Sequence, residues 1–178
     1  MNTNVARADQ RNESGLAVLT LDLDGHVFAI EATHVLEILD LVAVTEVPGA
    51  GPFVGGLINV RGKVVPVADL RHKFGMPQRE AGIDTRVVVI ELDLDGDLTT
   101  VGLIADKVFE VTEIAATAVE ETPKVGMTWR HEYIRCIGKR GNDFIIVLDI
   151  GAVFSLGRLD KPKSTANAAE PALEAVAS

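Results

Sequence analysis

The string Leu21-Asp22-Leu23-Asp24-Gly25 decides the fold, because the chain spells it a second time as Leu92-Asp93-Leu94-Asp95-Gly96. In each string the alternating leucines predict a strand, and Asp-Gly predicts a tight hairpin turn, since both turn positions require positive φ. Further matches pair 32–38 with 105–111 and 69–70 with 149–150, at offsets that grow from 71 to 80 residues. A repeat of this length is too long for a solenoid unit. Two similar small domains are therefore predicted.

Short strands joined by glycine turns fill both copies. In the first copy the predicted strands are 16–23, 27–30, one long or bent strand over 35–47, 56–60 and 63–67, followed by a short helix over 68–74. In the second copy they are 87–94, 99–104, 108–116, 134–139 and 144–148, with a loop at 120–128 and a helix over 149–156. Strands of this length and spacing favour small barrels. Closing each sheet on itself also removes exposed edges.

The domain boundaries follow from composition. A polar, disordered tail is predicted over 1–15, a first barrel over 16–75, a Pro/Gly/charge-rich linker over 76–85 and a second barrel over 86–156. The Ala/Pro/Ser/Glu-rich segment 157–178 is predicted to be disordered or loosely helical.

Charge and composition exclude several functional classes. The formal charge is −9 with no local basic stripe, which argues against nucleic-acid binding. The single cysteine, Cys136, cannot form an internal disulfide and fits a reducing compartment. The N-terminus has no apolar signal region, and no apolar run is long enough to span a bilayer. A cytoplasmic protein with no membrane insertion is predicted.

The motifs that would carry chemistry are incomplete. After Asp22-Leu23-Asp24-Gly25 the ligand spacing and the bidentate glutamate of a calcium loop are missing. No two of the four histidines stand at metal-ligand spacing, and the glycines match no phosphate-binding loop. We therefore predict no metal and no cofactor. His131 and Cys136 are five residues apart and leave open a catalytic pair, although no orienting residue is evident.

One polar constellation stands apart from these patterns. Asn59-Val60-Arg61-Gly62 places an arginine at the tip of an otherwise apolar hairpin. Arg61 could be a solvated turn residue, or a recognition residue whose planar fork meets a carboxylate. Glu37, a charge enclosed by apolar neighbours, is the obvious internal partner.

Four strings together resemble the CheW family, the coupling proteins of bacterial chemotaxis arrays. They are FAIEATHVLEIL (28–39), PGAGPFVGGLINVRGKVVPVADLRHKFG (48–75), TVGLIADKVFEV (100–111) and EYIRCIGKRGNDFIIVLDI (132–150). The resemblance covers about 16–156, and the run 54–70 is its most specific part. Cys136 replaces a usual glycine of the family, and Leu36 replaces a position that is often polar.

The resemblance implies a mainly all-β fold of two tandem five-stranded SH3-like β-barrels with short helices, in a family whose barrels can exchange terminal segments. It implies a non-catalytic adaptor that couples transmembrane chemoreceptors to a CheA-type histidine kinase. The expected partners are the cytoplasmic tip of methyl-accepting chemoreceptors, the kinase regulatory domain and other CheW-like domains in rings. The protein would then be recruited from the cytoplasm to membrane receptor arrays.

The same resemblance assigns candidate contact residues. The receptor-side candidates are Val35, Glu37, Ile38, Arg61, Val87 and Val108, with Asn59, Val60, Arg61 and Gly62 as the motif. Weaker kinase-side candidates are Thr45, Glu46, Val47, Pro48 and Phe53. Each apolar candidate could equally belong to the core, because a strand buries every second side chain. Two alternatives remain open beside the enzyme: a CheW-like adaptor of twitching motility or a surface-sensing diguanylate cyclase system, and a fragment of a larger protein.

Overall fold

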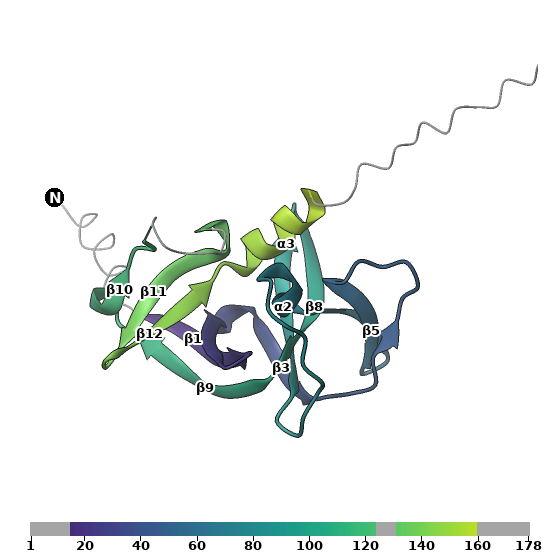
Figure 1. Cartoon of the computed structure of the whole chain (residues 1–178). Coiled ribbons are helices and arrows are strands. Elements are labelled where there is room, and N and C mark those ends of the chain that lie inside the picture. The colour runs from purple at the N-terminus through teal and green to yellow at the C-terminus, as the bar shows by residue number, and fades with distance from the viewer. Residues whose placement is uncertain (1–14, 124–130, 160–178) are drawn as a thin grey trace, which may run out of the picture.

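The computed structural model describes residues 15–123 and 131–159, which form two six-stranded sheets (Figure 1). The first sheet has the order β10 (Val119–Glu120), β11 (Ile134–Arg140), β12 (Asp143–Leu148), β2 (His26–Glu31), β1 (Leu16–Leu23) and β9 (Lys107–Ile114). The second has the order β3 (Val35–Asp40), β7 (Arg86–Leu94), β8 (Asp97–Ala105), β6 (Lys63–Ala68), β5 (Val54–Val60) and β4 (Thr45–Glu46). We call them barrel 1 and barrel 2. The helices are α2 (Leu70–Lys73) and α3 (Ile150–Leu159), with 3-10 turns at Ala32–His34, Ala116–Ala118 and His131–Tyr133.

The two copies of the repeat exchange their first hairpins. The β1–β2 hairpin of the first copy joins β9–β12 of the second copy, and the β7–β8 hairpin joins β3–β6. Parallel pairing of β2 with β12 and of β6 with β8 completes the two sheets. The predicted division into sequential barrels, 16–75 and 86–156, therefore does not describe the sheets. The chain crosses from one barrel to the other between β2 and β3 and again between β8 and β9, so each copy contributes to both.

The turn chemistry explains the hairpins. At Asp24-Gly25, Arg61-Gly62 and Asp95-Gly96 both residues have φ between 53° and 90°, as two-residue hairpin turns require. The carboxylates of Asp22 and Asp93 each accept a hydrogen bond from the turn glycine, at 2.9 and 2.7 Å. These predicted hairpins are confirmed, with β1 paired to β2, β5 to β6 and β7 to β8.

Other predicted boundaries differ from the structure. The long strand predicted over 35–47 ends at Asp40, and only Thr45–Glu46 returns to the sheet as β4. Each sheet has a sixth strand of two residues, β4 or β10, beside the five that were expected. The second helix extends to Leu159, beyond the predicted start of the C-terminal tail. The tails 1–14 and 160–178 and most of the predicted loop 120–128 lie outside the described residues.

Three apolar clusters hold the described residues together. One fills barrel 1 around Val18, Cys136 and Val147, and another fills barrel 2 around Ile58, Val65 and Val87. The largest lies between the barrels. It combines the β1–β2 and β7–β8 hairpins with side chains from both helices: Leu19, Leu21, Leu23, Phe28, Ile30, Leu70, Phe74, Val88, Ile90, Leu92, Leu94, Leu103, Ile150, Val153 and Phe154. Hairpin exchange thus makes the interface between the barrels a core in its own right.

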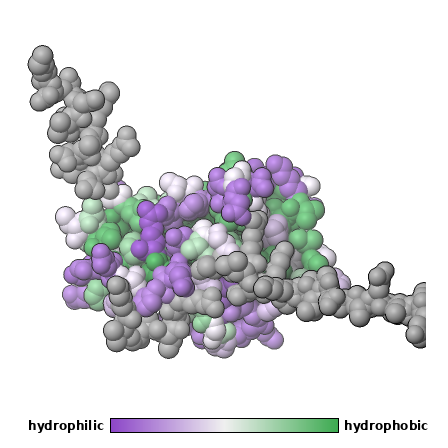
Figure 2. Space-filling model, turned by 90° about the horizontal axis from the view of Figure 1, so that it is seen from above, coloured by the Kyte–Doolittle hydropathy of each residue, from purple (hydrophilic) through white to green (hydrophobic). Residues whose placement is uncertain are grey.

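Both helices follow the last strand of a copy, and α3 crosses from barrel 1 to pack on β7 of barrel 2 (Figure 1). Seen from the α3 side, hydrophilic residues are interspersed with smaller groups of hydrophobic ones (Figure 2). Asp69 and Asp149 directly precede the two helices, and their carboxylates accept hydrogen bonds from the backbone N–H groups of Arg71 and Ala152.

Candidate functional site

The predicted partnership of Arg61 with Glu37 is present. Arg61 Nη2 donates to Glu37 Oε2 at 2.9 Å, and the turn is tied by Asn59 Oδ1, which accepts from the Gly62 N–H at 2.8 Å. The Arg61 side chain is 82% exposed, against 24% for Glu37. Val60 points the other way and belongs to the interior of barrel 2. The motif therefore holds the arginine outward, with donors left for a second partner.

A β-bulge sets the surface around Glu37. Two residues of β3 span the interval from Val35 to Glu37 while β7 advances by one. Bulges re-aim side chains and bend the strand locally. Val35 consequently packs against the core between the barrels, whereas Leu36 and Ile38 are 55% and 43% exposed. We call Leu36, Glu37, Ile38 and Arg61 the β3 surface. Leu36, Ile38 and Arg61 are its exposed members, and the partly buried Glu37 holds Arg61.

Two other receptor-side candidates take different positions. Val108, on β9, is half-buried and packs against the core between the barrels, as Val35 does. Val87 is fully buried inside barrel 2. Strand alternation turns Val87 into the barrel and Val88 toward the other barrel, so both faces of β7 are covered there. Val87 is a core residue and no partner contact, which corrects that assignment.

Barrel 1 carries a related surface that motif reasoning missed. Arg140 Nη2 donates to Glu110 Oε1 at 2.6 Å, and both side chains are 54% exposed. A bulge again displaces this part of β9, where Phe109 and Val111 are exposed. We call Phe109, Glu110, Val111 and Arg140 the β9 surface. The repeat alignment, which matches Glu37 with Glu110, was the signal that could have found it.

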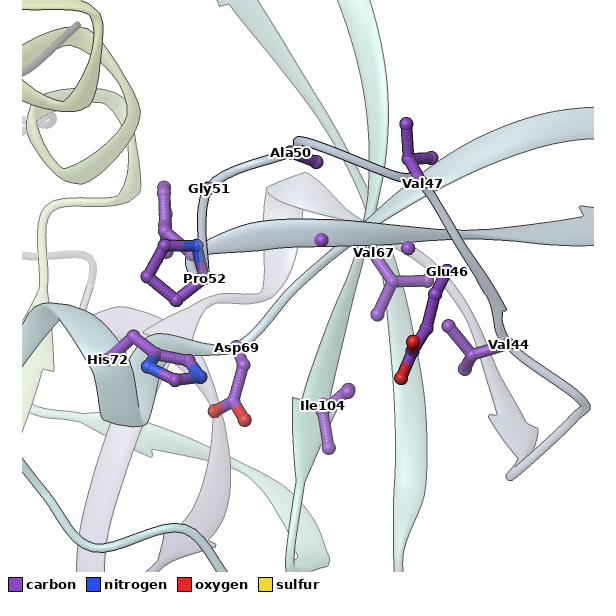
Figure 3. Close-up of a pocket in the computed structure, with 13 residues that line it drawn as sticks. Val44, Glu46, Val47, Ala50, Gly51, Pro52, Val67, Asp69, His72 and Ile104 are labelled. Atoms are coloured by element: carbon purple, nitrogen blue, oxygen red, sulfur yellow. The ribbon is translucent and has the colours of Figure 1, made fainter. Parts of the chain in front are cut away.

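Three kinase-side candidates, Glu46, Val47 and Phe53, line a pocket of about 310 Å³ in barrel 2 (Figure 3). Glu46 and Val47 lie toward one end of it, and Asp69 and His72 toward the other. Thr45, Glu46, Val47 and Pro48 are all exposed. Phe53 is half-buried instead. Its ring is tilted against that of Phe154, with 5.3 Å between the centroids, and Lys73 Nζ lies 4.8 Å from the Phe53 ring centroid. The contacts of its ring with Phe154 and Lys73 anchor the loop to the core.

A buried ionic cluster joins the barrels. Arg71, whose side chain is 7% exposed, donates from Nε and Nη2 to the two carboxylate oxygens of Asp69, at 2.9 and 2.7 Å. Its Nη1 donates to Asp106 Oδ1 at 3.2 Å, and Asp106 Oδ2 accepts from the Asp24 N–H at 2.7 Å. Arg79 Nε lies 2.7 Å from Asp24 Oδ1. The hydrogen bond to Asp69 raises the pKa of Arg71 against the opposing effect of burial.

The catalytic pair left open by the sequence finds no support in the geometry. Cys136 is buried in the interior cluster of barrel 1, whereas His131 is exposed. Desolvation raises the pKa of the Cys136 thiol, which is the opposite of what activates a nucleophile. Among the described residues no group of three or more His, Cys, Asp or Glu side chains could hold a metal ion. The described helices include none long and apolar enough to cross a bilayer.

Two small barrels with exchanged hairpins and exposed edge-strand surfaces define a binding module of SH3-like subdomains. A family model described as CheW-like domain matches residues 17–157. The chain belongs to the CheW family.

Relatives and a solved structure agree with that assignment. The chain is 31% identical over 153 residues to "Chemotaxis protein CheW" of Bacillus subtilis, covering 85% of this chain and 92% of that protein. It is 30% identical over 141 residues to the protein of the same name from Klebsiella aerogenes, covering 79% and 82%. The crystal structure of the scaffolding protein TtCheW from Thermoanaerobacter tengcongensis superposes with a TM-score of 0.69 at 29% identity, covering 79% of this chain and 88% of that one.

Proposed function

We propose that this protein is a non-catalytic chemotaxis adaptor that couples transmembrane chemoreceptors to a CheA-type histidine kinase in signalling arrays. Its relatives named CheW and the scaffolding protein TtCheW support this proposal. The observation that carries it is the highly exposed Arg61, held by the partly buried Glu37, beside a strand whose Leu36 and Ile38 are exposed. This is an interaction surface, and it needs no nucleophile.

The β3 surface would receive the helical cytoplasmic tip of a receptor, with Val35 and Val108 supporting it from the core. Each helix side chain fully buried there contributes roughly 1.5–3 kcal/mol before association costs. Arg61 would orient the helix, because its planar fork can bind a second carboxylate while it stays paired with Glu37. Apolar burial supplies affinity in this arrangement, and the arginine supplies register.

The loop over 45–53 would receive the regulatory domain of the kinase, with Thr45, Glu46, Val47 and Pro48 exposed and Phe53 fixing the loop. Docking barrel to barrel with the kinase or with other CheW-like domains would extend the assembly into rings. One adaptor that touches receptor and kinase together raises the effective concentration of each for the other. Weak separate contacts then suffice to recruit the protein from the cytoplasm to membrane arrays.

The test is a pull-down with a receptor cytoplasmic fragment and the kinase, scored for a ternary complex. We expect Arg61→Glu to abolish receptor binding, because it places a like charge beside Glu37 where a partner carboxylate would sit. Arg61 is 82% exposed, so the melting temperature should change little.

Arg140→Glu is the matched control, since it reverses an arginine of a similar exposed ion pair on barrel 1. It should leave receptor binding at the level of the parent. An Arg61→Glu protein that melts like the parent and still binds the receptor fragment would refute the assignment of the β3 surface.

A second candidate function is a CheW-like adaptor of another pathway, such as twitching motility or a surface-sensing diguanylate cyclase system. The chain is 34% identical over 88 residues to "Protein PilI" of Pseudomonas aeruginosa, covering 49% of this chain and 47% of that protein. Family members thus include proteins with other names. Parallel pull-downs with receptors and kinases of each pathway, all at one concentration, separate the two candidates.

A further inference from the structure

The ionic cluster around Arg71 spans three parts of the fold. Arg71 lies on α2, directly after the last strand of its copy in barrel 2. Asp106 lies between β8 and β9, where the chain passes from barrel 2 to barrel 1. Asp24 lies in the β1–β2 turn of barrel 1 and donates its N–H to Asp106. The side chain of Asp106 therefore bridges an arginine of one barrel and a backbone group of the other.

The cluster adjoins the proposed kinase-side loop and the strand that carries Val108, which supports the proposed receptor face from the core. Asp69, which binds Arg71 through both oxygens, lines the pocket beside the loop 45–53, and its N–H donates to the Phe53 carbonyl at 2.9 Å. At the other end, Asp106 directly precedes β9, which carries Val108 and the β9 surface. A continuous run of hydrogen bonds thus links the kinase-side loop to the residue before β9, the strand whose Val108 supports the proposed receptor face from the core.

Close packing of the core between the barrels restricts how they are turned relative to each other, and the ionic cluster adds a directional constraint. The core between the barrels is large, but hydrophobic attraction is non-directional. A guanidinium paired through two nitrogens with one carboxylate is directional, and its planar fork fixes the angle as well as the distance. Arg71 also donates to Asp106 on the crossover, so the angle it fixes is one between the barrels.

We propose that Arg71 and Asp106 are positioning residues that fix the orientation of barrel 1 relative to barrel 2, and with it the spatial relation of the two partner faces. The first part concerns the protein alone, whereas the second rests on the proposed adaptor function. The repeat places Gly151 at the position of Arg71 and Thr33 at that of Asp106. The ionic bridge consequently forms on one side only of an otherwise duplicated arrangement.

The first experiment measures, in the full chain, a distance between the barrels that changes when their relative orientation changes. Nitroxide labels are attached at Val64→Cys in barrel 2 and Phe144→Cys in barrel 1, two exposed positions, in a Cys136→Ala background. Pulsed electron paramagnetic resonance then gives the distance distribution between the labels. Asp106→Asn removes the charge of the bridge while Arg71 keeps Asp69, and Arg71→Lys keeps the charge while losing the fork.

We expect both variants to broaden the distance distribution by about twofold, since the remaining apolar interface is non-directional. Arg86→Lys is the control. It alters an arginine paired with the exposed Asp40 at 3.3 Å, both on strands of barrel 2, and should leave the distribution unchanged. Each protein is measured well below its own unfolding midpoint, and if Arg71→Lys does not fold, Asp106→Asn decides.

Variants that lose thermal stability but keep the distribution of the parent would overturn the proposal, because the cluster would then serve stability alone. A distribution broadened equally by Arg86→Lys would overturn it as well, since any lost ion pair would then suffice.

The second experiment measures the consequence for partners. Kinase-fragment affinity is determined with and without saturating receptor fragment, and coupling between two sites is typically 5–150-fold. Asp106→Asn should keep the affinity for each separate fragment and abolish most of the coupling. Coupling at the level of the parent would refute the role of the bridge. A parent protein that binds neither fragment would instead refute the proposed function, whatever the distance measurement shows.

Discussion

Barrel 1 and barrel 2 are built from equivalent strands in equivalent order, yet they carry charge in different places. Each strand of the first copy has its equivalent six places later, so that β1 corresponds to β7 and β6 to β12. Exchanging every strand for its equivalent converts one sheet order into the other. In barrel 2 a buried arginine follows Asp69, while in barrel 1 a glycine follows Asp149 at the same offset. After duplication the backbone pattern was kept, and the ionic contacts differ between the copies.

The surfaces differ in the same way. Arg61 sits within its turn at φ 53° and is 82% exposed, whereas Arg140 is the last residue of β11 and is 54% exposed. Glu37 is more buried than Glu110, so its orientation is more restricted. The less exposed Glu37 restricts the orientation of Arg61, while the high exposure of Arg61 keeps its remaining N–H donors accessible to a partner. The equally exposed Arg140 and Glu110 are less restricted. This difference favours the β3 surface as the recognition site.

The largest effect should come from the position that differs most between the barrels. Arg71→Met leaves Asp69 and Asp106 facing a buried apolar side chain, and removing one partner of a buried ion pair costs about 3–5 kcal/mol. At the equivalent position of barrel 1, Gly151→Ala should stabilise the protein by about 0.5–1 kcal/mol, since alanine favours α3. Chemical denaturation of both variants measures the two values. If both substitutions changed the free energy of unfolding in the same direction, the predicted difference between these equivalent positions would be wrong.

The sequence predicted the local part of this architecture. Asp-Gly pairs and alternating leucines were enough for the hairpins, and the Arg61–Glu37 pair followed from a turn arginine and a glutamate among apolar residues. Hairpin exchange was beyond local patterns, because β2 pairs with β12 across most of the chain and no turn specifies that register. The buried pairing of Arg71 had no local signal either, because only folding places Asp106 beside it.

An intermediate effect on stability is expected at a position where barrel 2 has a glycine and barrel 1 has a cysteine. Gly56 and Cys136 are equivalent in the repeat, but a Cβ on Gly56 would lie 2.3 Å from Val44 Cγ1. Gly56→Ala should therefore cost about 1–3 kcal/mol through overpacking, which Val44 relieves only by moving. Cys136→Ala removes one buried sulfur and should cost about 1 kcal/mol.

The matched control for that pair is Gly56→Ala combined with Val44→Ala, which removes the clashing methyl group. If the clash sets the cost, this double variant should be more stable than the sum of its two single variants predicts. Strict additivity would show that the two sites do not couple, and that Gly56 is required for another reason.

The smallest effect is a pH dependence of stability that comes from Cys136 of barrel 1. Barrel 2 has no titratable counterpart, because Gly56 takes the equivalent position. Burial raises the pKa of Cys136 above its ordinary value of 9.0, so the folded state holds this proton more tightly than the unfolded state. Its contribution to stability is then complete below pH 9.0 and is lost as the pH rises through the folded-state pKa. Comparing the unfolding free energies of the parent and Cys136→Ala at about pH 7 and about pH 10 isolates it, because all other groups titrate in both proteins. The advantage of the parent should shrink at the higher pH. A constant difference would mean that water reaches the thiol in the folded protein, contrary to its burial in barrel 1.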